Sequence, residues 1–154
     1  MLRANIYMGL YIQARGQSPV RYVLPAHRPR GARRLLRLFR PPPQERGALQ
    51  YVPPPTSSAE QLRVCGDTHG QLQDVLTILS NHGPPSATNR YIFNGDIADR
   101  GPHAVEIFML VLLFQLTTPY AVWVTRGNHE ARDINERPAN EGGGFLDEVV
   151  PKYD

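Results

Sequence analysis

Three short glycine-containing segments recur along the chain, and each comes directly after an apolar run of strand length. They occupy residues 66–70, 95–101 and 127–130, and they contain most of the chain's closely spaced Asp, His and Asn residues. The interval between them is about 30 residues, which is the length of one βα unit. Because parallel strands end at the same edge of a sheet, this spacing predicts that the three polar turns lie together. The pattern therefore predicts a βαβαβ fold with a ligand site at one sheet edge.

From residue 61 onward, strand and helix patterns alternate with short polar connections, which is typical of a mostly parallel α/β sheet. A helix is predicted over residues 71–80, because apolar residues recur there at helical spacing. A second helix is predicted over residues 104–116, which are apolar on nearly every face, as in a helix packed between layers. Strands are expected at residues 62–65, 91–93 and 120–125.

The first part of the chain has a different composition. Residues 1–50 hold ten arginines and one acid, a net charge of +9, whereas the remainder holds seven Lys/Arg against thirteen Asp/Glu, a net charge of −6. Prolines interrupt residues 1–60 and favour extended backbone. We therefore predict a largely disordered basic extension over residues 1–60, with a short basic helix at 32–40, and a folded domain over residues 61–154. The extension also interleaves Tyr with Arg, as RNA-binding segments do, but a solvated tail is favoured over RNA binding.

The single cysteine and the length of the longest apolar run indicate in which cellular compartment the protein is expected. Cys65 is the only cysteine, so no intramolecular disulfide can form, and a reducing compartment, cytoplasmic or nuclear, is expected. The longest apolar run, residues 104–116, is shorter than the roughly 20 residues that span a bilayer, so no membrane association is expected. The Arg-rich start leaves organelle targeting as a less favoured alternative.

The residue types in the three segments suit a metal site. Asp67 and His69 lie two residues apart in a turn, Asp96 follows the second predicted strand, and Asn128 follows the third. Carboxylate, imidazole and amide groups are common ligands of divalent metals, and Asp96 between two ions would bridge them. For the first segment alone, a helix-capping Asp67 and a surface His69 are favoured over a metal site. The three segments together favour a pair of divalent metal ions, which would activate water for attack on a phosphate.

Three further residues complete the candidate site. Arg100 offers a planar fork of donors suited to phosphate oxygens, although a salt bridge that orders its loop is an alternative. His129 stands next to Asn128 and is a candidate general acid for the leaving group. Asp99 is a candidate carboxylate to orient His129.

These segments resemble the signatures of a known family. Residues 64–71, 91–96 with 99–101, and 126–130 are similar to motifs of the PPP family of serine/threonine protein phosphatases, within the metallophosphoesterase superfamily. Residues 85–89 add a similarity to the protein phosphatase 5 branch. The resemblance implies half of a metallophosphoesterase-type sandwich and two divalent metal ions of the Mn, Fe or Zn type.

The resemblance also implies residue roles. Asp67, His69 and Asp96 would hold one metal, and Asp96 with Asn128 the other. Arg100 would bind phosphate, and His129, oriented by Asp99, would protonate the leaving group. The implied reaction is hydrolysis of phosphoserine or phosphothreonine in a protein substrate by a hydroxide that bridges the metals. The resemblance names no regulatory partner.

The resemblance covers residues 62–134 strongly. In the family, a second half of the domain brings two more histidine ligands and another arginine, whereas no histidine follows His129 here. We therefore expect a truncated product with impaired activity. The helix at 104–116 is expected to expose an apolar flank, and residues 138–144, which read as an insertion, are expected to loosen the edge beyond the site. Alternative functions are a dinucleoside polyphosphate hydrolase of the same superfamily and a non-catalytic phosphoprotein-binding module.

Overall fold

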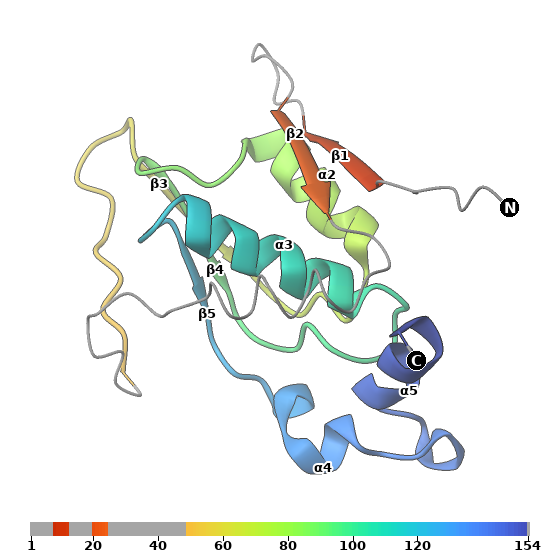
Figure 1. Cartoon of the computed structure of the whole chain (residues 1–154). Coiled ribbons are helices and arrows are strands. Elements are labelled where there is room, and N and C mark those ends of the chain that lie inside the picture. The colour runs from red at the N-terminus through yellow and green to blue at the C-terminus, as the bar shows by residue number, and fades with distance from the viewer. Residues whose placement is uncertain (1–7, 13–19, 25–48, 154) are drawn as a thin grey trace, which may run out of the picture.

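A three-stranded parallel sheet forms the centre of the folded domain (Figure 1). The computed structural model describes residues 8–12, 20–24 and 49–153. Its sheet has the order β3 (Gln61–Cys65), β4 (Asn89–Phe93) and β5 (Val122–Val124). The helices α2 (Leu72–His82) and α3 (Ala104–Thr117) connect these strands. The predicted α/β class and the parallel strand order are confirmed.

The element boundaries differ from the predictions by a few residues. Helix α2 continues to His82, and Gly83, with φ of 81°, ends it. Strand β5 is shorter than the predicted 120–125, because Tyr120 has a left-handed φ of 64°, which is incompatible with a strand. The sheet register pairs Arg63 with Tyr91 and Tyr91 with Val122.

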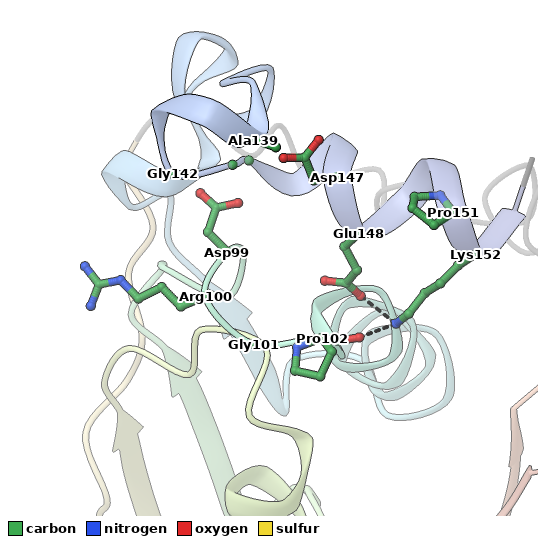
Figure 2. A pocket seen from close by; sticks show the side chains of 12 residues that line it. Asp99, Arg100, Gly101, Pro102, Ala139, Gly142, Asp147, Glu148, Pro151 and Lys152 are labelled. Atoms are coloured by element: carbon green, nitrogen blue, oxygen red, sulfur yellow. Dashed lines mark hydrogen bonds and ion pairs between the residues drawn. The ribbon is translucent and has the colours of Figure 1, made fainter.

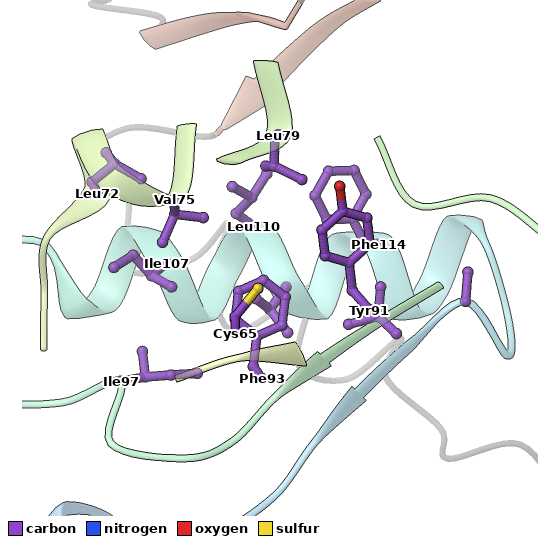
Figure 3. Packing of buried hydrophobic residues seen from close by; sticks show 13 residues of the cluster. Cys65, Leu72, Val75, Leu79, Tyr91, Phe93, Ile97, Ile107, Leu110 and Phe114 are labelled. Atoms are coloured by element: carbon purple, nitrogen blue, oxygen red, sulfur yellow. The ribbon is translucent and has the colours of Figure 1, made fainter. Parts of the chain in front are cut away.

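Both helices share one hydrophobic core with the sheet (Figure 3). Because the strand order is sequential and such crossovers are right-handed, α2 and α3 cover the same face of the sheet. The core side chains from the helices include Val75, Leu79, Ile107 and Phe114, and those from the strands include Tyr91, Phe93 and Val122. On the opposite face of the sheet, Val64 is 67% exposed.

Two short strands occur in the N-terminal part, where the sequence predicted no strand. The strands β1 (Met8–Ile12) and β2 (Val20–Leu24) form an antiparallel pair, which lies beside α2 in Figure 1. Strand β1 contacts α2, and β2 contacts α3. The short helix predicted at residues 32–40 lies outside the described residues.

Helix α3 exposes less of its apolar flank than predicted. Its apolar residues are buried or half-buried, and the large exposed apolar side chains of the described structure all lie on other elements. The reason is that β2 and the C-terminal helix α5 (Phe145–Tyr153) both contact α3, and the ring of Phe108 meets that of Phe145 edge to face at 5.6 Å. No helix in the described part of the chain is long and apolar enough to cross a membrane.

The segment after β5 returns toward the start of α3. It consists of η1 (Asn128–Glu130), α4 (Arg132–Asn135), η2 (Ala139–Glu141) and α5. It thus passes over the edge of the sheet at which all three strands end (Figure 1). The predicted polar turns lie at that edge.

Candidate active site

Backbone hydrogen bonds join the first two polar turns directly. The amides of Thr68 and His69 donate to the carbonyl of Asp96 at 3.1 and 2.9 Å, and the amide of Gly70 donates to the carbonyl of Ile97 at 2.8 Å. The approach is so close that a Cβ atom on Gly70 would lie 2.4 Å from the carbonyl oxygen of Gly101. Glycine at residue 70 is therefore required for the two turns to meet.

The third turn binds the second through Asp96. The amide of His129 donates to Asp96 Oδ1 at 2.9 Å. A Cβ atom on Gly127 would lie 2.1 Å from the same oxygen, so this position also excludes a side chain. The three turns therefore form one connected unit, as the regular spacing of the sequence predicted.

The side chain of Glu130 fixes the backbone of the second turn. Its Oε2 accepts from the amides of Asp96 and Gly127 at 2.8 and 2.9 Å, and its Oε1 accepts from Ile97 and Ala98 at 2.8 and 3.2 Å. No sequence pattern assigned a role to Glu130. Its position three residues after Gly127 is the one signal available, because a Glu at that spacing commonly accepts a backbone hydrogen bond at a helix start.

Several candidate residues adopt backbone conformations that are unfavourable for side-chain-bearing residues. His69, Asp96, Asp99 and Arg100 have φ values of 40°, 48°, 69° and 67°. Each such residue costs about 1–3 kcal/mol, and this strain concentrates at functional sites. The contacts of Glu130 and the backbone hydrogen bonds between the turns offset this cost. The strained backbone therefore coincides with residues that the sequence predicts to bind a metal, bind phosphate or take part in catalysis.

Asp67, His69 and Asp96 form a cluster suited to a metal ion. Each offers a ligand atom, and these atoms all lie within 4.8 Å of one another. Nδ1 of His69 lies 2.8 Å from the carbonyl of Ala98, which can only accept, so Nδ1 carries the proton. The lone pair of the neutral ring is then on Nε2, which lies 3.6 Å from Asp67 Oδ2. A backbone carbonyl that holds the other nitrogen is the usual environment of a metal-binding histidine, so these residues fit a cation.

Asn128, the remaining predicted ligand, begins η1 and lies next to this cluster. The following residue, His129, donates its amide to Asp96, so the chain passes the carboxylate at this point. The side chain of Asn128 is exposed. Its amide is therefore accessible beside the cluster.

His129 and Asp99 form a close pair. Nδ1 of His129 lies 2.7 Å from Oδ2 of Asp99, and both side chains are largely buried. Because the carboxylate accepts the Nδ1 proton, it fixes the ring so that Nε2 points away from Asp99. The rings of His129 and His69 are 4.7 Å apart and meet edge to face, so His129 lies beside the cluster. Asn135 Nδ2 donates to the backbone carbonyl of His129, a contact that no sequence pattern predicted.

Arg100 is exposed and lies on the same turn as Asp96 and Asp99. Within the described residues its guanidinium makes no ion pair, so the alternative of a loop-ordering salt bridge finds no support there. Figure 2 shows the side chain directed away from Glu148 and Lys152. The guanidinium is therefore available for an anion.

Helix α5 binds the start of α3, directly after the turn that carries Arg100. Glu148 accepts from the amides of Ala104 and Val105, each at 3.0 Å. Lys152 donates to Glu106 and Glu148 at 2.9 to 3.0 Å and to the carbonyl of Pro102 (Figure 2). Partial burial opposes the charge of Lys152, but these carboxylates outweigh it and raise its pKa. No sequence signal identifies Glu148, because 44 residues separate it from Ala104.

Comparison with known proteins gives consistent matches. Residues 61–154 match the family model described as calcineurin-like phosphoesterase. The serine/threonine-protein phosphatase rdgC of Drosophila melanogaster is 45% identical over 101 residues, which are 66% of this chain and 14% of the relative. Human serine/threonine-protein phosphatase 5 is 46% identical over 94 residues, 61% of this chain and 18% of the relative.

A solved structure is also similar. It is a protein serine/threonine phosphatase from Saccharomyces cerevisiae, described as similar to human phosphatase PP5, and it matches with a TM-score of 0.53 and 35% identity. The match covers 61% of this chain and 31% of that chain. The present chain thus spans less than a fifth of the two relatives and about a third of the solved structure.

Proposed function

The chain belongs to the calcineurin-like phosphoesterase family, and on this premise we propose that it derives from a metal-dependent serine/threonine protein phosphatase. The proposed reaction is the hydrolysis of phosphoserine and phosphothreonine in proteins. We assign the catalytic unit to residues 61–154 and a basic extension to residues 1–60. The relatives named as serine/threonine-protein phosphatases support this choice of substrate.

The observation that carries the proposal is the juxtaposition of the Asp67, His69 and Asp96 cluster with the pair formed by His129 and Asp99. The ligand atoms of Asp67, His69 and Asp96 lie within 4.8 Å of one another, and the ring of His129 lies 4.7 Å from that of His69. Phosphate-ester hydrolysis needs both a way to activate water and a group that protonates the leaving oxygen. With metal bound, the cluster and the pair would supply these two functions at one sheet edge.

Two divalent ions are the proposed cofactor. Asp67, His69 and Asp96 would hold one ion, and Asp96 with Asn128 would contribute to the other. When bound, such ions lower the pKa of water and neutralise the charge of the phosphate oxygens.

The chain's own residues have three tasks in this reaction. Arg100 would bind the phosphate through its free guanidinium and orient it. His129 would then donate the proton on Nε2 to the serine or threonine oxygen as the phosphorus–oxygen bond breaks and water supplies the new oxygen. Asp99, 2.7 Å from His129 Nδ1, would keep the ring in the orientation that this transfer requires.

Two measurements test the proposal. Titration with Mn²⁺ should show binding that Asp67→Asn weakens by at least about tenfold. Hydrolysis of a phosphoserine peptide with Mn²⁺ should fall by about 10²- to 10⁴-fold in His129→Ala, with Mn²⁺ binding retained. His82→Ala is the matched control, because His82 is an exposed residue at the end of α2 and should leave both measurements unchanged.

The results also separate the two alternative functions. A preference for diadenosine tetraphosphate over the phosphopeptide would replace the proposal with a dinucleoside polyphosphate hydrolase. Mn²⁺ and phosphopeptide binding without turnover, in both the wild-type protein and His129→Ala, would indicate a non-catalytic phosphoprotein-binding module. Failure to bind Mn²⁺ would refute the metal site itself.

A further inference from the structure

A pocket of about 490 Å³ lies beside Arg100, between two parts of the chain that are distant in sequence (Figure 2). One wall is the turn from Asp99 to Pro102. The other comes from residues 139–152, which include the segment that reads as an insertion. This segment was expected to loosen the edge beyond the site. It lines the pocket instead, and α5 anchors it to the start of α3 through Glu148.

Two charged groups of this pocket already have partners within the protein. Lys152 is paired with Glu106 and Glu148, and Glu148 also accepts from two backbone amides of α3. These contacts fix the wall formed by α5 and largely cancel its charge. Neither Lys152 nor Glu148 therefore requires a ligand.

Two carboxylates that line the same pocket have unused acceptor atoms. The side chain of Asp147 is exposed, and it makes no hydrogen bond or ion pair with any described residue. Asp99 is only 9% exposed; its Oδ2 binds His129, but its Oδ1 has no hydrogen-bond partner in the described structure. A buried acceptor without a partner is unfavourable and rare in native proteins.

The position of the pocket relative to Arg100 limits what can occupy it. Figure 2 shows the Arg100 guanidinium on the side away from α5, and the carboxylate of Asp99 directed toward Gly142 across the pocket. A phosphate bound by Arg100 would neutralise the guanidinium. The remaining unpaired charge that lines the pocket is then negative, and its free groups only accept hydrogen bonds. A cationic side chain with several N–H donors complements such a surface.

We propose that this pocket binds a lysine or arginine that neighbours the phosphorylated residue of the substrate, with Asp147 as the residue that determines this preference. The inference rests on the proposed function, because Arg100 must hold the phosphate for the neighbouring side chain to reach the pocket. It names the substrate class as phosphoproteins with a basic residue beside the phosphoserine or phosphothreonine.

Binding of hydrolysis-resistant phosphonate peptides tests this preference. Two peptides that differ only by Lys or Ala next to the phosphonate are compared on the wild-type protein, on Asp147→Asn and on Glu141→Gln. Glu141→Gln is the matched control, because it removes one negative charge from the same segment at a residue that does not line the pocket. The wild-type protein should bind the Lys peptide about three- to fivefold more tightly, as expected for one partly exposed charge pair. Asp147→Asn should abolish this ratio, and Glu141→Gln should keep it.

The outcomes distinguish a failure of the pocket assignment from a failure of the proposed function. Equal affinity of the wild-type protein for the Lys and Ala peptides overturns the pocket assignment, while hydrolysis of phosphopeptides would still support the phosphatase. Loss of the ratio in Glu141→Gln as well overturns the role of Asp147, because the effect would then reflect net charge. Lack of both phosphonate binding and phosphopeptide hydrolysis, with either peptide, refutes the proposed function and with it the inference.

Discussion

Replacement of Glu130 by alanine should destabilise the domain more than any comparable change of a partly exposed acid. The substitution removes the acceptors of four backbone amides, at 2.8 to 3.2 Å. Hydrogen bonds to a charged group contribute about 1.5–3 kcal/mol each. Since the site is only partly buried, water can replace some of them, and we count two as lost. The expected loss in the free energy of unfolding is then about 3 kcal/mol.

Glu130→Gln should lose at least half of this amount. One oxygen of Gln can still accept from one pair of amides, but its NH₂ group would face the other pair, donor against donor. The measurement is urea unfolding followed by the fluorescence of Trp123, the only tryptophan, which is 9% exposed. A loss of about 3 kcal/mol lowers the midpoint by roughly 1–2 M.

Glu136→Ala is the control for Glu130→Ala. Glu136 belongs to the same segment, and its single ion pair with Arg132, at 3.9 Å, is well exposed. Such pairs contribute less than about 1 kcal/mol. If Glu130→Ala and Glu136→Ala unfold at the same urea concentration, the conclusion that Glu130 stabilises the second turn is wrong.

Three further changes test other parts of the structure. Gly70→Ala should lower the free energy of unfolding by at least about 2 kcal/mol, because its Cβ would overlap the carbonyl of Gly101. Calorimetry should show a clearly lower melting temperature than that of the wild-type protein. An unchanged melting temperature would contradict the close contact of the turns. Tyr91→Phe should cost about 1 kcal/mol in urea unfolding, because the carbonyl of Gly83 loses its 2.7 Å donor and keeps only Asn89 Nδ2 at 3.2 Å; no loss would mean that Asn89 alone satisfies this carbonyl. Because the pKa of Lys152 is raised above its ordinary 10.5, its ion pairs stabilise the folded state fully below that value and are lost as the pH rises through the higher folded-state pKa. The stability difference between the wild-type protein and Lys152→Met, about 1–2 kcal/mol at pH 8, should therefore shrink above pH 10.5, and a difference that stays constant to higher pH would exclude this linkage.

Local pattern and spacing predicted the elements that depend on nearby residues. The apolar spacing of Leu72, Val75 and Leu79 predicted α2, and all three are buried in the core. The boundaries were less accurate, because turn conformations such as the left-handed Tyr120 depend on the surrounding fold. Strand β2 was not predicted, since the arginine and proline content around it favours extended chain, whereas its contact with α3 is a tertiary effect.

The sequence alone determined that Asp67, His69 and Asp96 would meet, because the βα period places every strand end at one edge of a parallel sheet. The sequence also predicted His129 and Asp99 to be a pair, and His129 Nδ1 lies 2.7 Å from Asp99 Oδ2 in the structure. The catalytic and ligand roles of these residues stay predictions that the metal and turnover measurements test.

Only the tertiary structure decided how the turns are held in place and what lies beside them. Glu130 and Glu148 bind backbone amides at the two ends of the second turn, and α5 closes a pocket next to Arg100. These contacts join residues more than 30 positions apart, and they use carboxylates that have no periodic pattern. Periodicity specifies which residues share a face or an edge, whereas the partner of a single side chain depends on how the elements pack.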